Sequence, residues 1–184
     1  MEYVWKKEYE TGHPVVDFQH RQVHNAFKCL LEGCSAGMDT DQAETTLDFL
    51  AEYCGRHLRD MNDEKTRLHS QYPFQLNNDY LHTILVRYVN ELRDELKKEG
   101  CTPAFREKLC HYLREMTEKY TEHISREKTA GIAEHANWSR LPPETKLDIL
   151  QTIGAASRLN VSQNAPLIIA ATERLVQLVV CHSR

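Results

Sequence analysis

Long apolar runs, an excess of positive charge and closely spaced cysteine pairs are all missing from this sequence of 184 residues. Its 23 lysines and arginines are outnumbered by 27 aspartates and glutamates, and the formal net charge of -4 gives no general attraction to nucleic acid or anionic lipid. The first ten residues, MEYVWKKEYE, contain no apolar segment of the kind that directs export. We therefore expect a cytoplasmic protein with no nucleic-acid partner and no membrane partner.

Cysteine, glycine and proline are each few in number and are scattered along the chain. The six cysteines include no Cys-x-x-Cys pair and fall within helical patterns, so we expect reduced and mostly buried thiols. Seven glycines, six prolines and 27% charged residues are typical of a helical domain. The sequence has no Gly-x-Ser-x-Gly, no phosphate-binding Gly-x-x-x-x-Gly-Lys and no His-Glu-x-x-His motif, and we therefore expect that the protein is not an enzyme.

The sequence does contain apolar positions that recur three and four residues apart. They predict helices at about 15–33, 41–61, 77–99 and 103–124, joined by short connections. Asp41 and Glu44 have the spacing of a capping box at the start of the second helix. Gly100 has the position of a helix-ending glycine, and Thr102 precedes a proline suited to the first helical turn. Together these features predict an all-α fold, an antiparallel four-helix bundle.

Two further helical patterns follow, from Pro142 to Leu159 and from about Asn164 to Val180. We expect a four-helix bundle over residues 1–132 and a C-terminal two-helix extension over 133–184. The last pattern is too short and too charged to span a membrane and must be buried against protein. Two interpretations are open: the pair packs on the bundle as an intrachain hairpin, or it offers a surface for a homodimer or another protein partner.

The most specific motif lies near the N-terminus. Trp5 is followed by Tyr9, by Thr11-Gly12 and by Asp17-Phe18-Gln19-His20. This pattern resembles the N-terminal motif of the bacterial hemerythrin family, and the resemblance extends over roughly residues 3–132. It implies a four-helix bundle that holds two non-haem irons with five histidines and two bridging carboxylates, and that binds dioxygen reversibly.

The resemblance also places the ligand positions. Four of the family's histidine positions are occupied here by histidines, one in each predicted bundle helix: His20, His57, His82 and His123. Three positions differ, because Met61 and Lys128 stand where the family has its bridging carboxylates and Asn78 stands where it has a fifth histidine. Both anions that would hold two cations close together are therefore lost, which argues against an intact diiron centre.

The residues themselves support a histidine-rich interior site. Imidazoles that converge inside a bundle need hydrogen-bond partners or a metal to satisfy their nitrogens. Glu127, one helical turn after His123, is the best substitute carboxylate, whereas Asp60, Asp63 and Glu64 fit a solvated helix face better. His24, one turn after His20, fits a packing partner for a neighbouring helix better than a ligand.

Three hypotheses follow. In the first, some of His20, His57, His82 and His123, together with Glu127 or water, hold one non-haem metal ion, such as iron or zinc. Dioxygen is then a further partner if iron is bound, and the protein binds or senses oxygen or redox state. In the second, the site is vestigial and metal-free, and the bundle is a protein-interaction or dimerisation module. In the third, shifted carboxylates complete a true diiron site.

Overall fold

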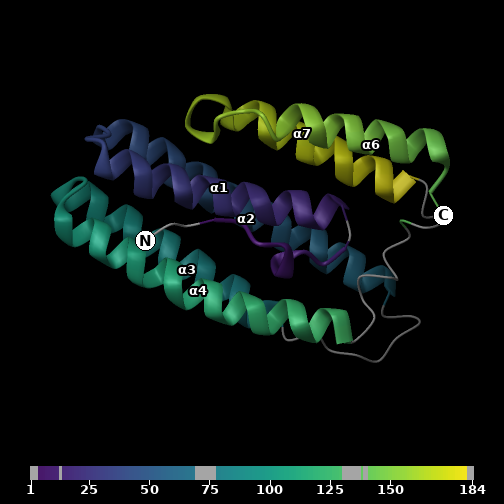
Figure 1. Ribbon diagram of the computed structural model, residues 1–184, viewed down its shortest axis with the longest axis horizontal. Coiled ribbons are helices and arrows are strands. Elements are labelled where there is room, and N and C mark those ends of the chain that lie inside the picture. Colours follow the sequence, from purple (N-terminus) through teal and green to yellow (C-terminus); the bar gives the residue numbers. More distant parts are fainter. Residues whose placement is uncertain (1–3, 13, 69–77, 130–137, 139–140, 182–184) are drawn as a thin grey trace. The chain divides into compact units, whose positions relative to one another are not determined.

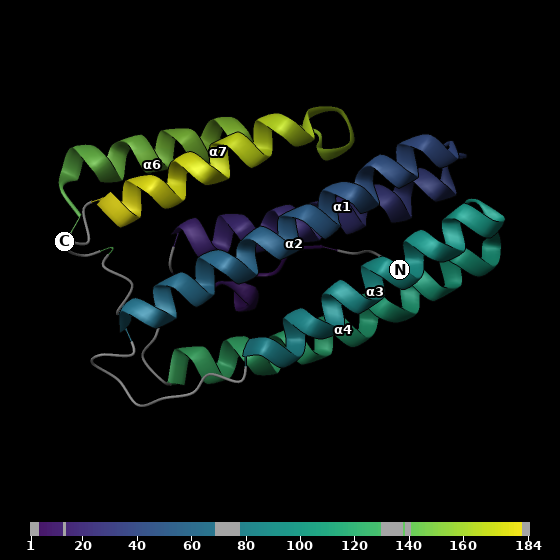
Figure 2. The same ribbon diagram turned by 180° about the vertical axis from the view of Figure 1, so that it is seen from behind.

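The structure, a computed structural model, describes residues 4–12, 14–68, 78–129, 138 and 141–181. Within the helices, the side chains that lie outside the description are those of residues 57–68, 78–82, 123, 125–129, 162 and 179–181. Over the described part of the chain there are six α-helices, one 3-10 helix and no strand (Figures 1 and 2). The prediction of an all-α fold is confirmed.

The helices occupy the predicted stretches. The first five elements are η1 (Lys7–Tyr9), α1 (Pro14–Ser35), α2 (Thr40–Leu68), α3 (Asn78–Glu99) and α4 (Pro103–Thr129). The C-terminal pair is α6 (Pro143–Ala156) and α7 (Val161–Cys181). Helix α2 continues seven residues beyond the predicted end at Met61. Its last residues include Glu64, Lys65 and Arg67, residue types with good helix propensity, so the helix can continue without an apolar pattern.

The connection between α3 and α4 has the predicted caps. Gly100 adopts a φ of 71°, and its N–H donates to the Leu96 carbonyl over 2.8 Å. A positive φ favours glycine because it has no Cβ. Thr102 accepts a hydrogen bond from the Phe105 N–H through its side-chain oxygen, at 3.2 Å. Both ends of this short connection are therefore fixed by local hydrogen bonds.

The capping box predicted at Asp41 and Glu44 is wrong. Helix α2 begins at Thr40, so its first orphan N–H groups belong to residues before Glu44. Asp39 immediately precedes the helix, and its carboxylate accepts a hydrogen bond from the Gln42 N–H at 2.8 Å. The N-cap is therefore two residues earlier than the sequence indicated.

Helix α7 contains a kink where its start was predicted. Asn164 has non-helical angles, φ -129° and ψ 23°, and Pro166 lies two residues later. Proline has no N–H and suits the first turn of a helix, so the segment after Asn164 behaves as a new helical start. In the part of the chain described here, no helix is both long enough and apolar enough to cross a membrane.

The contacts divide the chain into two compact units. One comprises Met1–Lys28 with Tyr120–Arg184, and the other comprises Cys29–Lys119. The bundle boundary expected at residue 132 stays a prediction.

In the unit Cys29–Lys119, polar contacts connect α3 to both of its neighbours. Three side chains of α3, in order along the chain, contact side chains of α4: Tyr88 pairs with Glu115, Glu91 with Tyr112, and Glu95 with Lys108. The same helix forms two ion pairs with α2, Arg93–Asp48 and Lys97–Glu44. In both cases the partner's residue number falls as that of α3 rises.

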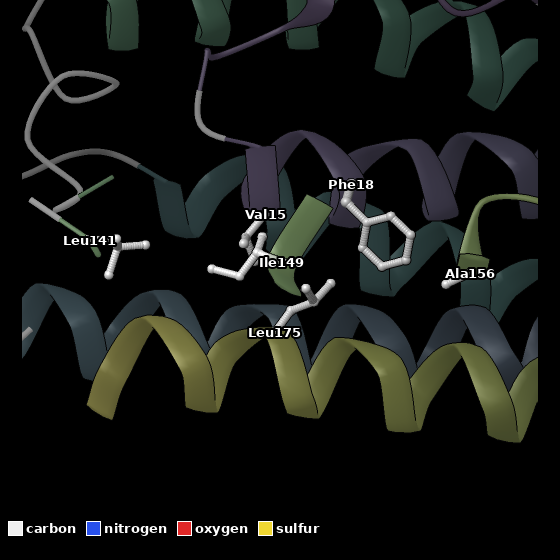
Figure 3. Packing of buried hydrophobic residues seen from close by; sticks show 6 residues of the cluster. All are labelled: Val15, Phe18, Leu141, Ile149, Ala156 and Leu175. Atoms are coloured by element: carbon white, nitrogen blue, oxygen red, sulfur yellow. The ribbon is translucent and has the colours of Figure 1, made fainter. Parts of the chain in front are cut away.

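In the other unit, α1 shares a hydrophobic core with the C-terminal helices. Val15 and Phe18 of α1, 4% and 1% exposed, pack with buried residues from the C-terminal segment. Figure 3 shows these partners together: Leu141, Ile149, Ala156 and Leu175. Helices α6 and α7 lie side by side in Figures 1 and 2. The C-terminal pair is therefore packed on the first helix of the same chain, as the intrachain interpretation expects.

Candidate functional site

The candidate site is built around His20, the one predicted metal ligand whose side chain the structure describes. His20 lies on α1 and is half-buried. Its Nδ1 is 2.5 Å from the hydroxyl oxygen of Tyr120 on α4, and the two rings meet edge to face with centroids 5.1 Å apart. Tyr120 thereby fixes the orientation of the imidazole.

The hydroxyl of Tyr120 has a second contact, with the backbone carbonyl of Tyr9 at 3.3 Å. A carbonyl can only accept, and a hydroxyl has a single hydrogen to donate. The arrangement that satisfies both contacts has the Tyr120 O–H donate to Tyr9 and the His20 Nδ1–H donate to Tyr120. In that tautomer the lone pair of the imidazole is on Nε2.

Aromatic rings from the N-terminal segment pack against Tyr120 and His24. Trp5 contacts the rings of Tyr9, His24 and Tyr120 with centroid distances of 5.6, 5.6 and 6.3 Å. Tyr9 in turn meets Tyr120 at 6.0 Å. Edge-to-face and tilted contacts of this kind stabilise aromatic clusters beyond the area that they bury. Trp5 and Tyr9 of the sequence motif therefore pack against Tyr120, the residue that contacts His20.

Asp17 of the same motif closes the turn before α1. Its carboxylate accepts hydrogen bonds from the Thr11 N–H at 2.6 Å, the Thr11 hydroxyl at 2.7 Å and the Gly12 N–H at 3.1 Å. Gly12 has a φ of 91°, a conformation that a residue with a Cβ rarely adopts. These contacts fix the segment that carries Trp5 and Tyr9, because it enters α1 through this turn.

His24 is a packing residue in this cluster. Its side chain is 7% exposed and lies edge to face with Trp5. Burial lowers the pKa of His24 from 6.5 to about 4; the side chain of Asn25 opposes this shift, and the positive charge of Lys28 adds to it. The neutral imidazole is therefore the form that the folded protein favours.

We expect His24 to make the protein less stable in mild acid. The folded-state pKa, about 4, lies below the unfolded value of 6.5, so protons bind preferentially to the unfolded chain. The contribution of the neutral His24 to stability is fully present above pH 6.5 and is lost as the pH falls toward 4. The loss from pH 7.5 to pH 5 should be at most about 2 kcal/mol, and less to the extent that water screens the ring.

Urea unfolding at pH 7.5 and pH 5 checks this expectation. His24→Gln should lose that part of the pH dependence, whereas the control His111→Gln, at a histidine whose side chain is 67% exposed, should keep it. An equal pH dependence in the parent and in His24→Gln would contradict the assignment.

The four remaining predicted ligands, and the three positions where this sequence departs from the family's ligands, lie on three other helices. Helix α2 carries His57 and Met61, α3 carries Asn78 and His82, and α4 carries His123, Glu127 and Lys128. The side chains of all seven lie outside the described residues, as do those of Asp60, Asp63 and Glu64. The structure thus confirms that the four histidines are distributed over four helices, and their convergence stays a prediction.

No family model, curated protein or solved structure matches this chain. Among the side chains that are described, no group of three or more histidines, cysteines and acidic residues is arranged to hold a metal. The hemerythrin resemblance accordingly stays a hypothesis based on the motif residues.

Tyr120 is the residue of this cluster that the sequence analysis does not identify. It lies on α4, three residues before His123. A contact between residues 20 and 120 leaves no trace in local spacing. The available signal was a tyrosine on the face predicted to point inward, since a buried phenol usually finds a polar partner.

Proposed function

We propose that this chain is a hemerythrin-like protein that binds one non-haem metal ion, iron or zinc, at an altered histidine-rich site inside an antiparallel four-helix bundle. Its role would be the binding or sensing of oxygen or of redox state. The observation that carries the proposal is the contact between His20 and Tyr120. Histidines that bind metals usually donate their other ring N–H to a neighbouring acceptor, which fixes the tautomer and raises the basicity of the ligating nitrogen.

The bundle arrangement is supported by the contacts of α3. Its partners on α2 and on α4 have residue numbers that fall as its own rise, the register of neighbours that run in opposite directions. Short connections between α1 and α2 and between α3 and α4 favour the same topology.

The donor set fits one ion better than two. His20, His57, His82 and His123 with Glu127 would hold the ion, and imidazole nitrogen is a good ligand for both iron and zinc. Met61 and Lys128 take the positions of the two bridging carboxylates, and the lysine adds positive charge to a site that would have to attract cations. When iron is bound, the site gains one-electron redox chemistry and an affinity for dioxygen. Tyr120 contributes by holding the imidazole of His20.

The test is metal affinity in Tyr120→Phe. Protein purified without an affinity tag or chelator, after iron supplementation, should contain about one ion per chain by elemental analysis. Loss of the hydroxyl should weaken metal binding roughly 10- to 100-fold in a competition titration. Tyr112→Phe is the matched control, because it removes a tyrosine hydroxyl that contacts Glu91 instead. Equal affinity in the parent and in Tyr120→Phe would overturn the role given to Tyr120.

The second candidate function is the metal-free interaction module, with a second copy of the chain as its partner. One observation favours it: Leu147, Leu150 and Leu167 of the C-terminal helices are 57%, 50% and 58% exposed. Large exposed apolar side chains on one helical pair are typical of protein-binding surfaces. A folded parent protein that contains no metal after iron supplementation would favour this candidate over the first.

A further inference from the structure

The unit Cys29–Lys119 contains a close pair of thiols. Cys34 lies near the end of α1, and Cys101 lies in the connection between α3 and α4. Their sulfur atoms are 3.1 Å apart, with the Cys34 S–H donating to Cys101. Both cysteines are reduced. A sulfur–sulfur bond is about 2.05 Å long, so the pair needs to close by only about 1 Å.

Both sulfurs are held by backbone that is fixed on either side. Cys101 follows Gly100, which ends α3, and precedes Thr102, whose side chain caps α4. Cys34 is followed by a tight turn in which the Met38 N–H donates to the Gly33 carbonyl at 2.8 Å. The two thiols therefore meet in the folded protein with little freedom to separate.

The two thiols differ in access. Cys34 is 6% exposed, whereas Cys101 is partly exposed in its connecting segment. Burial, followed by the hydrogen bond and charge of Cys101, raises the pKa of Cys34 to about 12, and Arg106 opposes this shift. An oxidant in solution therefore reacts with the more accessible Cys101 first, while the buried Cys34 stays a protonated thiol.

We propose that Cys34 and Cys101 form a reversible disulfide when the protein meets a peroxide. In the first step the Cys101 sulfur attacks one oxygen of hydrogen peroxide: an S–O bond forms, the O–O bond breaks, and the departing hydroxide takes the Cys101 thiol proton. The products are a sulfenic acid on Cys101 and one water. In the second step the Cys34 sulfur attacks the Cys101 sulfur. The S–S bond forms, the S–O bond breaks, and the departing hydroxide takes the Cys34 proton and leaves as water. A dithiol reductant returns both residues to thiols.

The bond would fasten the end of α1 to the connection between α3 and α4 and so constrain the unfolded chain. It involves none of the proposed metal ligands. The redox response is therefore expected in metal-free protein as well, which separates its failure from a failure of the proposed function.

The experiment treats the full chain, stripped of metal by a chelator, with a small excess of hydrogen peroxide. We expect two of the six thiols to disappear. Digestion with trypsin and a glutamate-specific protease should release a cross-link between residues 33–44 and residues 100–106, fragments that each hold one cysteine. The oxidised protein should melt about 5–15 °C higher, and dithiothreitol should reverse both changes.

Three variants complete the test. Cys101→Ser should give no cross-link, and Cys34→Ser should leave a sulfenic acid on Cys101 that dimedone traps. Cys110→Ser, at another partly exposed cysteine, should behave like the parent. If Cys34→Ser fails to fold, Cys101→Ser and Cys110→Ser still decide. A cross-link between other cysteines would overturn the proposal. It would also be overturned by Cys101 oxidised beyond sulfenic acid while Cys34 stays a thiol, or by an oxidised protein that melts no higher than the reduced one.

Discussion

The triple variant that combines Met61→Glu, Asn78→His and Lys128→Asp should bind two irons per chain, whereas we expect about one ion per chain in the parent. The substitutions return two carboxylates and one imidazole to the positions that the hemerythrin resemblance assigns to them. They also change the formal charge near the site by -3, since two acids are added and one lysine is removed. Two divalent cations close together need that negative charge.

Iron per chain after growth with added iron, measured by elemental analysis on protein with parental helix content, checks this result. Adding His20→Ala to the triple variant supplies the control, because it removes the proposed ligand that Tyr120 contacts and should lower iron content again. A folded triple variant that takes up no more iron than the parent would show that the motif positions after His57 are misplaced.

Leu175→Ala should lower the free energy of unfolding of the whole protein by about 2–5 kcal/mol. Leu175 is fully buried, in the core that α7 shares with Val15 and Phe18 of α1. Truncation removes the transfer free energy of the side chain and leaves a cavity among neighbours that are fixed by their own packing. The effect is large because the cluster joins the two ends of the chain.

Leu167→Ala is the matched control, on the same helix and with the same change in helix propensity. Leu167 is 58% exposed, so its truncation should change stability by no more than about 0.5 kcal/mol. Urea unfolding followed by circular dichroism compares the two variants. A loss below about 1 kcal/mol for Leu175→Ala, or a separate early transition, would mean that α6 and α7 unfold independently of α1.

Much of the fold was predictable because helix periodicity and helix ends are local properties. The caps at Gly100 and Thr102 lie where their residue types indicated, and the break in α7 lies where Pro166 indicated it. The start of α2 was misplaced because Asp39 and Asp41 are both good caps. The choice between them depends on the residue at which the preceding turn ends, and the spacing of residue types does not give that position.

The candidate site was predictable only in part. His20 and the Trp5 and Tyr9 positions were found because the motif is dense and local. Tyr120 was not found as the partner of His20, and Cys101 was not found as the partner of Cys34. Each of these pairs joins residues far apart in the sequence, and such contacts depend on how the helices pack rather than on the periodicity of any one of them.

Phe18 and His20 are two residues apart on α1 and therefore point about 200° away from each other. Phe18 contacts the C-terminal core, whereas His20 contacts Tyr120. A rotation of α1 about its own axis changes both contacts at once. Packing against the C-terminal helices therefore restrains the rotation of α1, and we expect that a displacement of Leu175 would also move the imidazole of His20, about half a helical turn from Phe18.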